Sequence, residues 1–182
     1  MPQEIIDVTE NNFNKVPKPS LRVDCKSCDF WEGGTSMLGS DAHAKELNKL
    51  ERIKSGAISA KLLCLDGKAI GYCQYGKLSA FSRSQAWRRR LKNPTLDDVF
   101  FITCVSIQKE HRGKGLATLL LNNVTNDLRS KGAQIIEALA QKPYSDRFSS
   151  GPEKLYLKCG FKIVEELPNL SLMRLVFVQE GK

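Results

Sequence analysis

Apolar and polar positions follow two periods along this chain, and these periods separate strands from helices. Runs rich in β-branched and aromatic residues are typical of strands, and apolar residues three or four positions apart are typical of amphipathic helices. Strands are predicted at residues 4–8, 60–65, 68–75, 99–107, 134–140, 161–166 and 170–178, and helices at 41–55, from 116 to 129–132 and at 153–158.

The turns between these elements predict how the strands pair. Asp66-Gly67 is typical of a tight hairpin turn, so residues 60–75 are expected to form an antiparallel pair. Gly71 interrupts the second strand, which indicates a bulge or a close backbone contact. The run VFFITCVSI at 99–107 is the longest apolar stretch and is expected at the centre of the sheet. The strand, helix and strand from 99 to 140 predict a parallel crossover, so the fold class is α/β (α+β) with both kinds of pairing.

The helix predicted at 41–55 has one apolar and one charged face. Such a helix normally turns its apolar stripe to the core and its charged face to water. The apolar stripe consists of Ala44, Leu47, Leu50 and Ile53, and the face expected in water consists of Lys45, Glu46, Lys49, Glu51 and Arg52.

A basic cluster lies in the long connection at 77–98. It surrounds Trp87 with Arg83, Arg88, Arg89, Arg90 and Lys92. Basic residues around an aromatic ring can bind nucleic acid or phosphate. We favour the simpler interpretation, a solvated helical face with Trp87 turned inward.

Length and composition fit one soluble domain over residues 1–182. The chain is 41% hydrophobic and 26% charged, which is ordinary for a globular protein. It has no apolar run long enough for a membrane span and no signal-peptide pattern at its start, so we expect a cytoplasmic protein. Its net charge of +8 suits an anionic ligand, an acidic partner or nucleic acid, and equally a generally basic surface.

The six cysteines do not predict a metal site. Cys25 and Cys28 have the spacing of half a zinc site, but a second half at similar spacing is missing from the sequence. We expect reduced thiols that pack as small apolar groups, with Phe30 and Trp31 anchoring their loop on the core. No metal is therefore expected.

The stretch VSIQKEHRGKGLAT at 105–118 predicts an anion-binding site. It joins a strand through a glycine-rich turn to the start of a helix. The first amides of a helix lack intrahelical acceptors, and the helix dipole adds positive potential there. Gly113 and Gly115 allow close approach to the backbone, and Arg112 and Lys114 add charge. The expected ligand is a phosphate or pyrophosphate.

Two motifs resemble the signatures of the GCN5-related N-acetyltransferase (GNAT) superfamily. Arg112, Gly115 and Ala117 supply its Gln/Arg-x-x-Gly-x-Gly/Ala pattern, and residues 156–161 supply its Tyr-x-Lys-x-Gly-Phe pattern. The start of the chain, Cys-x-x-Cys-x-Phe-Trp-Glu, is similar to that of a prokaryotic subgroup of the family. The resemblance implies a mixed, mostly antiparallel sheet with a parallel pair around the cofactor helix. Residues 1–40 would then be an N-terminal extension on the acceptor side.

The resemblance also implies a function, acetyl transfer from acetyl-CoA to a primary amine by direct attack. Tyr156 would be the general acid that protonates the departing thiolate, and an amide near the splayed end of the central strand would support the oxyanion. Ser149 stands where many relatives have an asparagine that touches the cofactor. The residues implied to bind acetyl-CoA are Val105, Ser106 and Ile107 for pantetheine, Arg112, Gly113, Lys114, Gly115, Leu116, Ala117 and Thr118 for pyrophosphate, and Ser149.

The general base and the acceptor are not evident from the sequence. Asp97, Asp98 and Glu137 are candidate bases, although each is individually better interpreted as a solvated carboxylate. The acceptor is expected to be a small-molecule or peptide amine that contacts the loops at 21–40, 77–98 and 142–151. The sequence leaves a homodimer open.

Two other interpretations compete with an acetyltransferase. Gly113-x-Gly115-x-x-Thr118 approximates a dinucleotide-binding turn with Glu137 downstream, but the third glycine is missing and an antiparallel hairpin precedes it. The alternative that we retain is a non-catalytic acyl-CoA-binding or nucleic-acid-binding module that uses the basic segment 83–92.

Overall fold

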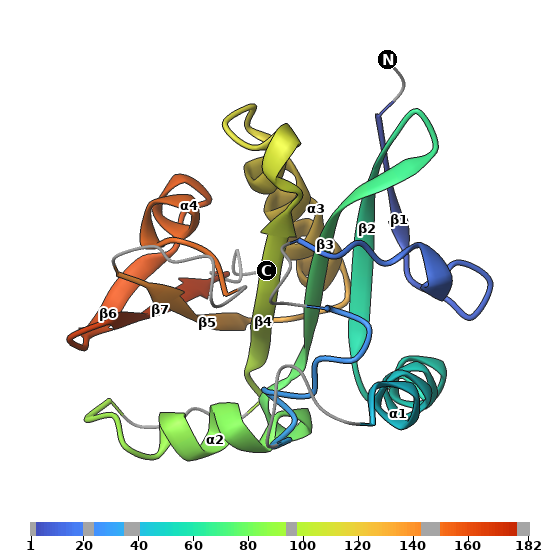
Figure 1. Ribbon diagram of the computed structural model, residues 1–182. Helices are drawn as coiled ribbons and strands as arrows, with labels where there is room; N and C mark the ends of the chain where they lie inside the picture. The colour runs from blue at the N-terminus through green and yellow to red at the C-terminus, as the bar shows by residue number, and fades with distance from the viewer. Residues whose placement is uncertain (1–2, 20–23, 35–40, 94–97, 143–149, 178–182) are drawn as a thin grey trace.

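The computed structural model describes residues 3–19, 24–34, 41–93, 98–142 and 150–177 (Figure 1). The elements lie within a few residues of the predicted positions, and one short helix, α2, is added in the 77–98 connection. The strands are β1 (Gln3–Asp7), β2 (Ser59–Leu65), β3 (Lys68–Lys77), β4 (Phe100–Ile107), β5 (Ile135–Gln141), β6 (Lys162–Glu166) and β7 (Leu170–Val176), and the helices are α1 (Ala42–Lys54), α2 (Ser82–Arg88), α3 (Leu116–Ser130) and α4 (Glu153–Lys158).

The strands form one sheet in the order β1-β2-β3-β4-β5-β7-β6. Every pair of neighbours among them is antiparallel except β4 and β5, which are parallel and joined through α3. This confirms the mixed, mostly antiparallel fold class, the central place of β4 and the crossover. Because β1 pairs with β2, the start of the chain belongs to the sheet itself.

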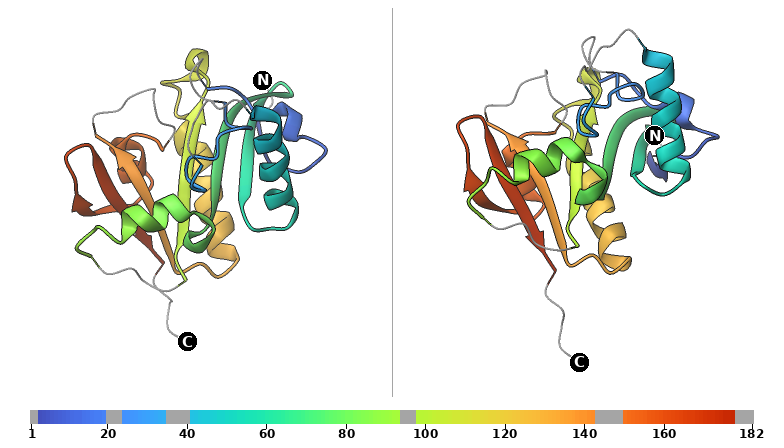
Figure 2. Two further views of the ribbon diagram at one scale, coloured as in Figure 1. Left: turned by 60° about the horizontal axis from the view of Figure 1, so that its bottom comes forward. Right: turned by 90° about the horizontal axis from the view of Figure 1, so that it is seen from below.

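Two cores fill the two faces of the sheet (Figure 2). Residues of α3 and α4, such as Leu120 and Tyr156, pack on one face together with Ile102 and Val105. The other face is covered by α1, α2 and the segment 24–34, whose Trp31 lies 6.4 Å from the ring of Phe101. Alternate residues of β4 therefore serve different cores, which explains its continuous apolar sequence.

Helix α1 is turned differently from the prediction. Lys49 is 4% exposed although it was assigned to the wet face, and Leu47 is 52% exposed although it was assigned to the core. The Lys49 ammonium donates to Gln74 Oε1 at 2.8 Å and lies 3.6 Å from a carboxylate oxygen of Glu32. These partners are distant in sequence, so the periodic pattern carried no sign of them.

The basic segment 83–92 is largely used inside the protein. Arg83 donates to the carbonyl oxygens of Phe30 and Gly34 at 2.6 Å each. Arg88 is 2% exposed, so the expectation of a solvated basic face is wrong for these two residues. Trp87 is partly buried against the core, as predicted. The internal contacts of Arg83 and Arg88 weaken the nucleic-acid interpretation.

Glu137, a candidate base, is instead the centre of a buried ion cluster. Its carboxylate is fully buried and lies 2.9 Å from Arg88 Nε and 2.6 Å from Arg174 Nη2. The cluster ties α2 to β5 and β7. Two guanidinium groups hold this carboxylate in its charged form, so it is not available to accept a proton from an amine.

Replacing Glu137 is expected to destabilise the fold strongly. The substitution Glu137→Ala leaves Arg88 and Arg174 without their common carboxylate, and such a loss costs about 3–5 kcal/mol. Urea unfolding of the purified protein measures the change. The matched control is Glu166→Ala, which removes only an exposed pair with Lys142 and should change the stability far less. Equal stability of the two variants would contradict a structural role for the cluster.

Candidate active site

The site begins where β4 parts from β5. The two strands pair only from Phe100–Ile102 to Ile136–Ala138, and beyond Ile102 strand β4 continues beside β3 alone. At the parting point the β3–β4 register skips Thr103, so this residue forms a β-bulge. Its hydroxyl donates to Gln74 O at 3.2 Å. The bulge increases the local bend of β4 and opens a gap in the middle of the sheet.

The gap exposes polar backbone groups of Val105 and Ile107. Gln108 N donates to Ile70 O at 2.8 Å, and in an antiparallel pair the donors alternate along the strand. The amides of Cys104 and Ser106 therefore point to β3, whereas those of Val105 and Ile107 point into the gap. The carbonyl oxygen of Ile107 also faces the gap, where it accepts a bond of 2.9 Å from Arg112 Nε.

The turn before α3 supplies a second set of unpaired amides. Gly113 and Gly115 have φ angles of 77° and 76°, a conformation that side chains disfavour, and Gly115 is the N-cap of α3. Within the described parts of the chain, the backbone amides of residues 113–118 have no hydrogen-bond acceptor. They form the N-terminal end of a helix of 15 residues, which is a favourable place for an anion.

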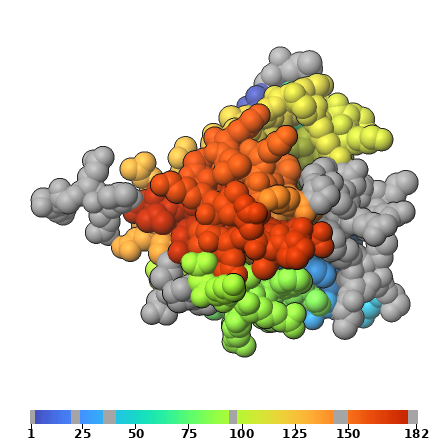
Figure 3. Space-filling model, turned by 90° about the vertical axis from the view of Figure 1, so that its left-hand side faces the viewer, coloured from blue at the N-terminus to red at the C-terminus, as the bar shows by residue number. Residues whose placement is uncertain are grey.

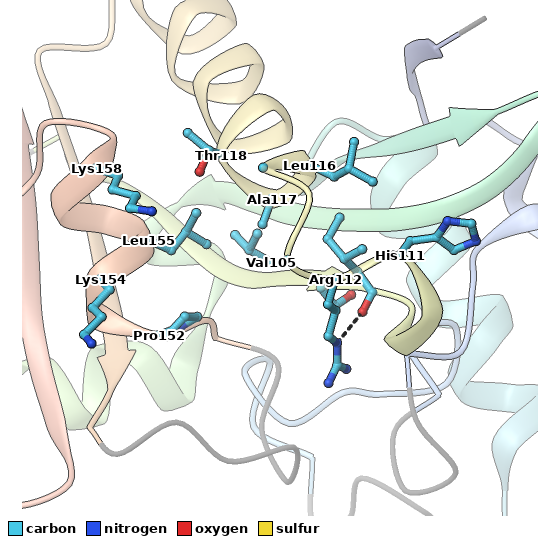
Figure 4. Close-up of a pocket in the computed structure, with 14 residues that line it drawn as sticks. Val105, His111, Arg112, Leu116, Ala117, Thr118, Pro152, Lys154, Leu155 and Lys158 are labelled. Carbon is cyan, nitrogen blue, oxygen red and sulfur yellow. Dashed lines mark hydrogen bonds between the residues drawn. The ribbon is translucent and has the colours of Figure 1, made fainter. Parts of the chain in front are cut away.

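A pocket of about 340 Å³ joins the β4 edge to this turn (Figure 4). The first turn of α3 forms one wall and α4 the opposite wall, and at the surface α4 lies beside the turn (Figure 3). The lining residues are Val105, Ser106, Ile107, His111, Arg112, Gly113, Gly115, Leu116, Ala117, Thr118, Pro152, Lys154, Leu155 and Lys158.

The pocket unites most of the predicted cofactor residues. Of the ten predicted between 105 and 118, nine line it, and Lys114 is the exception. Ser106 turns its hydroxyl away from the gap, to 3.5 Å from Tyr72 O. The guanidinium of Arg112 binds the backbone at Ile107 and Pro19 as well as lining the pocket. Ser149 lies outside the described residues.

Tyr156 lies behind the pocket wall. It is fully buried, and its hydroxyl donates to Ser150 O at 2.7 Å. Its ring meets that of Phe161 edge-on at 5.2 Å, and its neighbour Leu155 lines the pocket. Burial raises the pKa of the Tyr156 hydroxyl well above its ordinary value, because the phenolate would lose its hydration. The group therefore keeps its proton at neutral pH.

Five lining residues were not predicted from the sequence. They are His111, Pro152, Lys154, Leu155 and Lys158. Lys154 and Lys158 are exposed, lie one turn apart on α4 and place two positive charges on the wall opposite α3. Their spacing was visible in the sequence, but α4 is a six-residue helix and only the folded chain shows which wall it forms.

The remaining sequence candidates lie elsewhere. Asp98 is exposed and paired with Lys77, and Asp97 lies outside the described residues. Cys25 and Cys28 are buried, and burial raises the pKa of both thiols. Across the described ranges, no group of three or more His, Cys, Asp or Glu side chains is placed to hold a metal ion. No described helix has the length and apolar character needed to cross a membrane.

Comparison with known proteins identifies the family. The sequence model of the acetyltransferase (GNAT) family matches residues 28–161, most of the chain. The protein therefore belongs to the acetyltransferase (GNAT) family and is an acyltransferase, which confirms the resemblance found in its two motifs. No curated protein matches the sequence.

Solved structures share the whole fold. The yncA protein of Salmonella typhimurium, solved with acetyl-CoA, has a TM-score of 0.65 and 14% identity over 100% of this chain and 98% of its own. The PaiA N-acetyltransferase of Thermoplasma acidophilum, solved with coenzyme A, has a TM-score of 0.62 and 14% identity over 97% of this chain and 100% of its own. An N-acetyltransferase of Staphylococcus aureus Mu50 has a TM-score of 0.64 and 14% identity over 97% and 99% of the two chains. At such identity the likeness establishes the fold.

The turn glycine Gly115 provides a test of the anion site. Gly115→Ala forces a side chain into left-handed backbone, which costs about 1–2 kcal/mol, and places a methyl group where the phosphates would approach. We expect weaker acetyl-CoA binding in calorimetry. Gly132→Ala is the matched control, because Gly132 has a φ of 84°, equally open surroundings and a place at the far end of α3. Equal loss of binding in both variants would show an effect of stability alone.

Proposed function

We propose that the protein transfers the acetyl group of acetyl-CoA to the amine of a small-molecule or peptide acceptor by direct attack. The observation that carries this proposal is the unpaired edge of β4, which runs directly into the unpaired amides before α3. An extended chain of amides ending in a pyrophosphate matches this sequence of groups. A free nucleotide would match only the second part.

The two halves of the pocket divide the binding of this substrate. The amide of Ile107 would pair with the pantetheine arm as the amide of a neighbouring strand would, and the amides of residues 113–118 would bind the pyrophosphate. Leu116 and Leu155 would cover the apolar stretches of the arm. Thiol and acetyl group would then lie near the bulge at Thr103.

The acetyl carbonyl would lie next to the first free amide after the bulge, which belongs to Val105. A neutral amine attacks the carbonyl carbon, and the Val105 amide donates to the oxygen as negative charge develops on it. The new C–N bond forms as the C–S bond breaks. The amine loses a proton to solvent, and the departing thiolate takes a proton from a general acid.

We assign the general acid to Tyr156. Its hydroxyl is buried, protonated and located behind Leu155, and its bond to Ser150 O would have to be exchanged for one to the thiolate. A hydroxyl that already donates one bond can make this exchange by rotation about its C–O bond. The backbone of Gly151 is close to the ring, so the ring itself stays in place.

The acceptor would approach from the face covered by α2 and the segment 24–34. Two of the predicted acceptor loops contact each other there, since Arg83 N donates to Trp31 O at 3.1 Å and Ser82 Oγ donates to Glu32 O at 2.7 Å. This face is opposite the one on which α3 packs. The amine and the cofactor would therefore meet in the gap from opposite sides.

Removing the Tyr156 hydroxyl should slow turnover without weakening cofactor binding. Loss of a general acid reduces kcat by about 10²–10⁴-fold. We expect this effect in Tyr156→Phe, measured as thiol release with a panel of amine acceptors, together with an unchanged Kd for acetyl-CoA. Tyr75→Phe is the matched control, because Tyr75 is also buried but bonds to Asp127 on α3.

The pH dependence gives a second measurement on the same residue. An acid with a raised pKa stays protonated until the pH reaches that raised value, so Tyr156 should remain active above the ordinary tyrosine pKa of about 10. Turnover should rise with pH as the acceptor amine loses its proton and show no descending limb below about 10. Unchanged turnover in Tyr156→Phe would contradict the assignment.

The two lysines of α4 should strengthen acetyl-CoA binding through their charge. Lys154→Gln and Lys158→Gln are each expected to raise KM for acetyl-CoA roughly two- to fivefold and to leave kcat unchanged. The effect should shrink as salt is added, because exposed charges are screened. Lys162→Gln on β6 is the control, since Lys162 is exposed but does not line the pocket. Equal KM values in all three variants would contradict a role for this wall.

A further inference from the structure

A second pocket lies between α1 and the segment 24–34. Its volume is about 370 Å³, and it shares no lining residue with the acetyl-CoA pocket. The size falls in the range of small-ligand sites. The lining residues are Asp29, Glu32 and Gly34 from the segment, and Ala44, Lys45, Asn48, Lys49 and Arg52 from α1.

The orientation of α1 makes this pocket unusual. The helix turns Lys45 and Lys49, one turn apart, toward the body of the protein, where their side chains are 18% and 4% exposed. It leaves Leu47 in solvent. Withdrawing ammonium groups from water is costly unless they are paired. Departures from normal helix patterning of this kind concentrate at functional sites.

The charges that line the pocket do not cancel. Lys45 lies 3.2 Å from Asp29, and Lys49 lies 3.6 Å from Glu32, so these four side chains form two pairs. Arg52 has no carboxylate among the described residues that line the pocket. The pocket therefore holds one net positive charge, opposite a wall that carries both carboxylates.

The guanidinium of Arg52 is only partly satisfied by the protein. Its Nη2 donates to Ala80 O at 2.5 Å, whereas its buried Nε has no hydrogen-bond partner in the described parts of the chain. Buried donors without partners are rare and usually mark a site that another molecule completes. Asn48 lies one turn earlier on the same face of α1 and is exposed.

We propose that this pocket binds a small amino acid or similar zwitterion with an additional carboxylate. Its carboxylate would bind Arg52 and Asn48, because a guanidinium matches the planar geometry of that group. Its ammonium would lie toward Asp29 and Glu32. A phosphate dianion is disfavoured, since these two carboxylates face it across the pocket. The site is separate from the acetyl-CoA pocket, so the proposal does not depend on the proposed function.

Direct binding of L-glutamate to the full-length protein tests the proposal. L-glutamate carries the ammonium and two carboxylates that the pocket requires, and glutarate has the same carboxylates without the ammonium. Saturable binding of L-glutamate in saturation-transfer NMR and calorimetry is expected, with glutarate bound at least several-fold more weakly. No saturable binding of L-glutamate would overturn the proposal, and equal binding of glutarate would overturn the zwitterion class.

Two variants test whether the binding occurs in this pocket. Arg52→Gln removes the unbalanced charge, and Asn48→Trp fills the pocket from an exposed position. Each is expected to weaken L-glutamate binding about tenfold or more, as the loss of a charge-assisted hydrogen bond would. Lys158→Gln should leave it unchanged, and both pocket variants should bind acetyl-CoA normally. Wild-type affinity for L-glutamate in both Arg52→Gln and Asn48→Trp would overturn the location.

Discussion

The structure depends on one constraint, the loss of pairing between β4 and β5 after Ile102. A sheet normally satisfies the backbone groups of its central strands, and groups left unpaired inside a protein cost free energy. Here the amides of Val105 and Ile107 face a gap in the middle of the sheet. A ligand with its own backbone-like amides can satisfy them, so the structural cost becomes binding specificity.

Contacts on both sides of the gap hold it open. On the far side, Gln141 N donates to Gly151 O at 2.9 Å and the Tyr156 hydroxyl to Ser150 O, which anchors the start of α4 to the end of β5. On the near side, Asp127 of α3 accepts from the Tyr75 hydroxyl at 3.2 Å and lies 3.8 Å from the Lys61 ammonium. The anion-binding end of α3 is thereby fixed relative to β3 and β4.

Local patterns in the sequence predicted the sheet, the crossover and most of the cofactor pocket. Gly71 illustrates why. A bulge lies at its neighbour Ile70, and a Cβ at Gly71 would approach Ile107 Cδ1 to 2.7 Å, so both expected features are present. The turn at 112–118 was equally legible, because the conformations of Gly113 and Gly115 and the free helix amides are local properties.

Tertiary pairing produced the features that the sequence did not predict. Glu137 finds Arg88 and Arg174 from two distant elements, and Lys49 finds Gln74 and Glu32. A charged residue in an isolated pattern is assigned to water, since the partner that permits its burial is invisible. The same limit applies to Lys154 and Lys158, whose place on the pocket wall depends on how α4 docks.

Residue-resolved amide hydrogen exchange, measured by NMR with and without acetyl-CoA, tests the central claim most directly. Exchange reports whether a given amide is hydrogen-bonded. The account predicts that the amides of Val105 and Ile107 become protected when acetyl-CoA binds, while that of Ser106, already paired with β3, changes little. Binding of acetyl-CoA without added protection at Val105 and Ile107 would contradict the account.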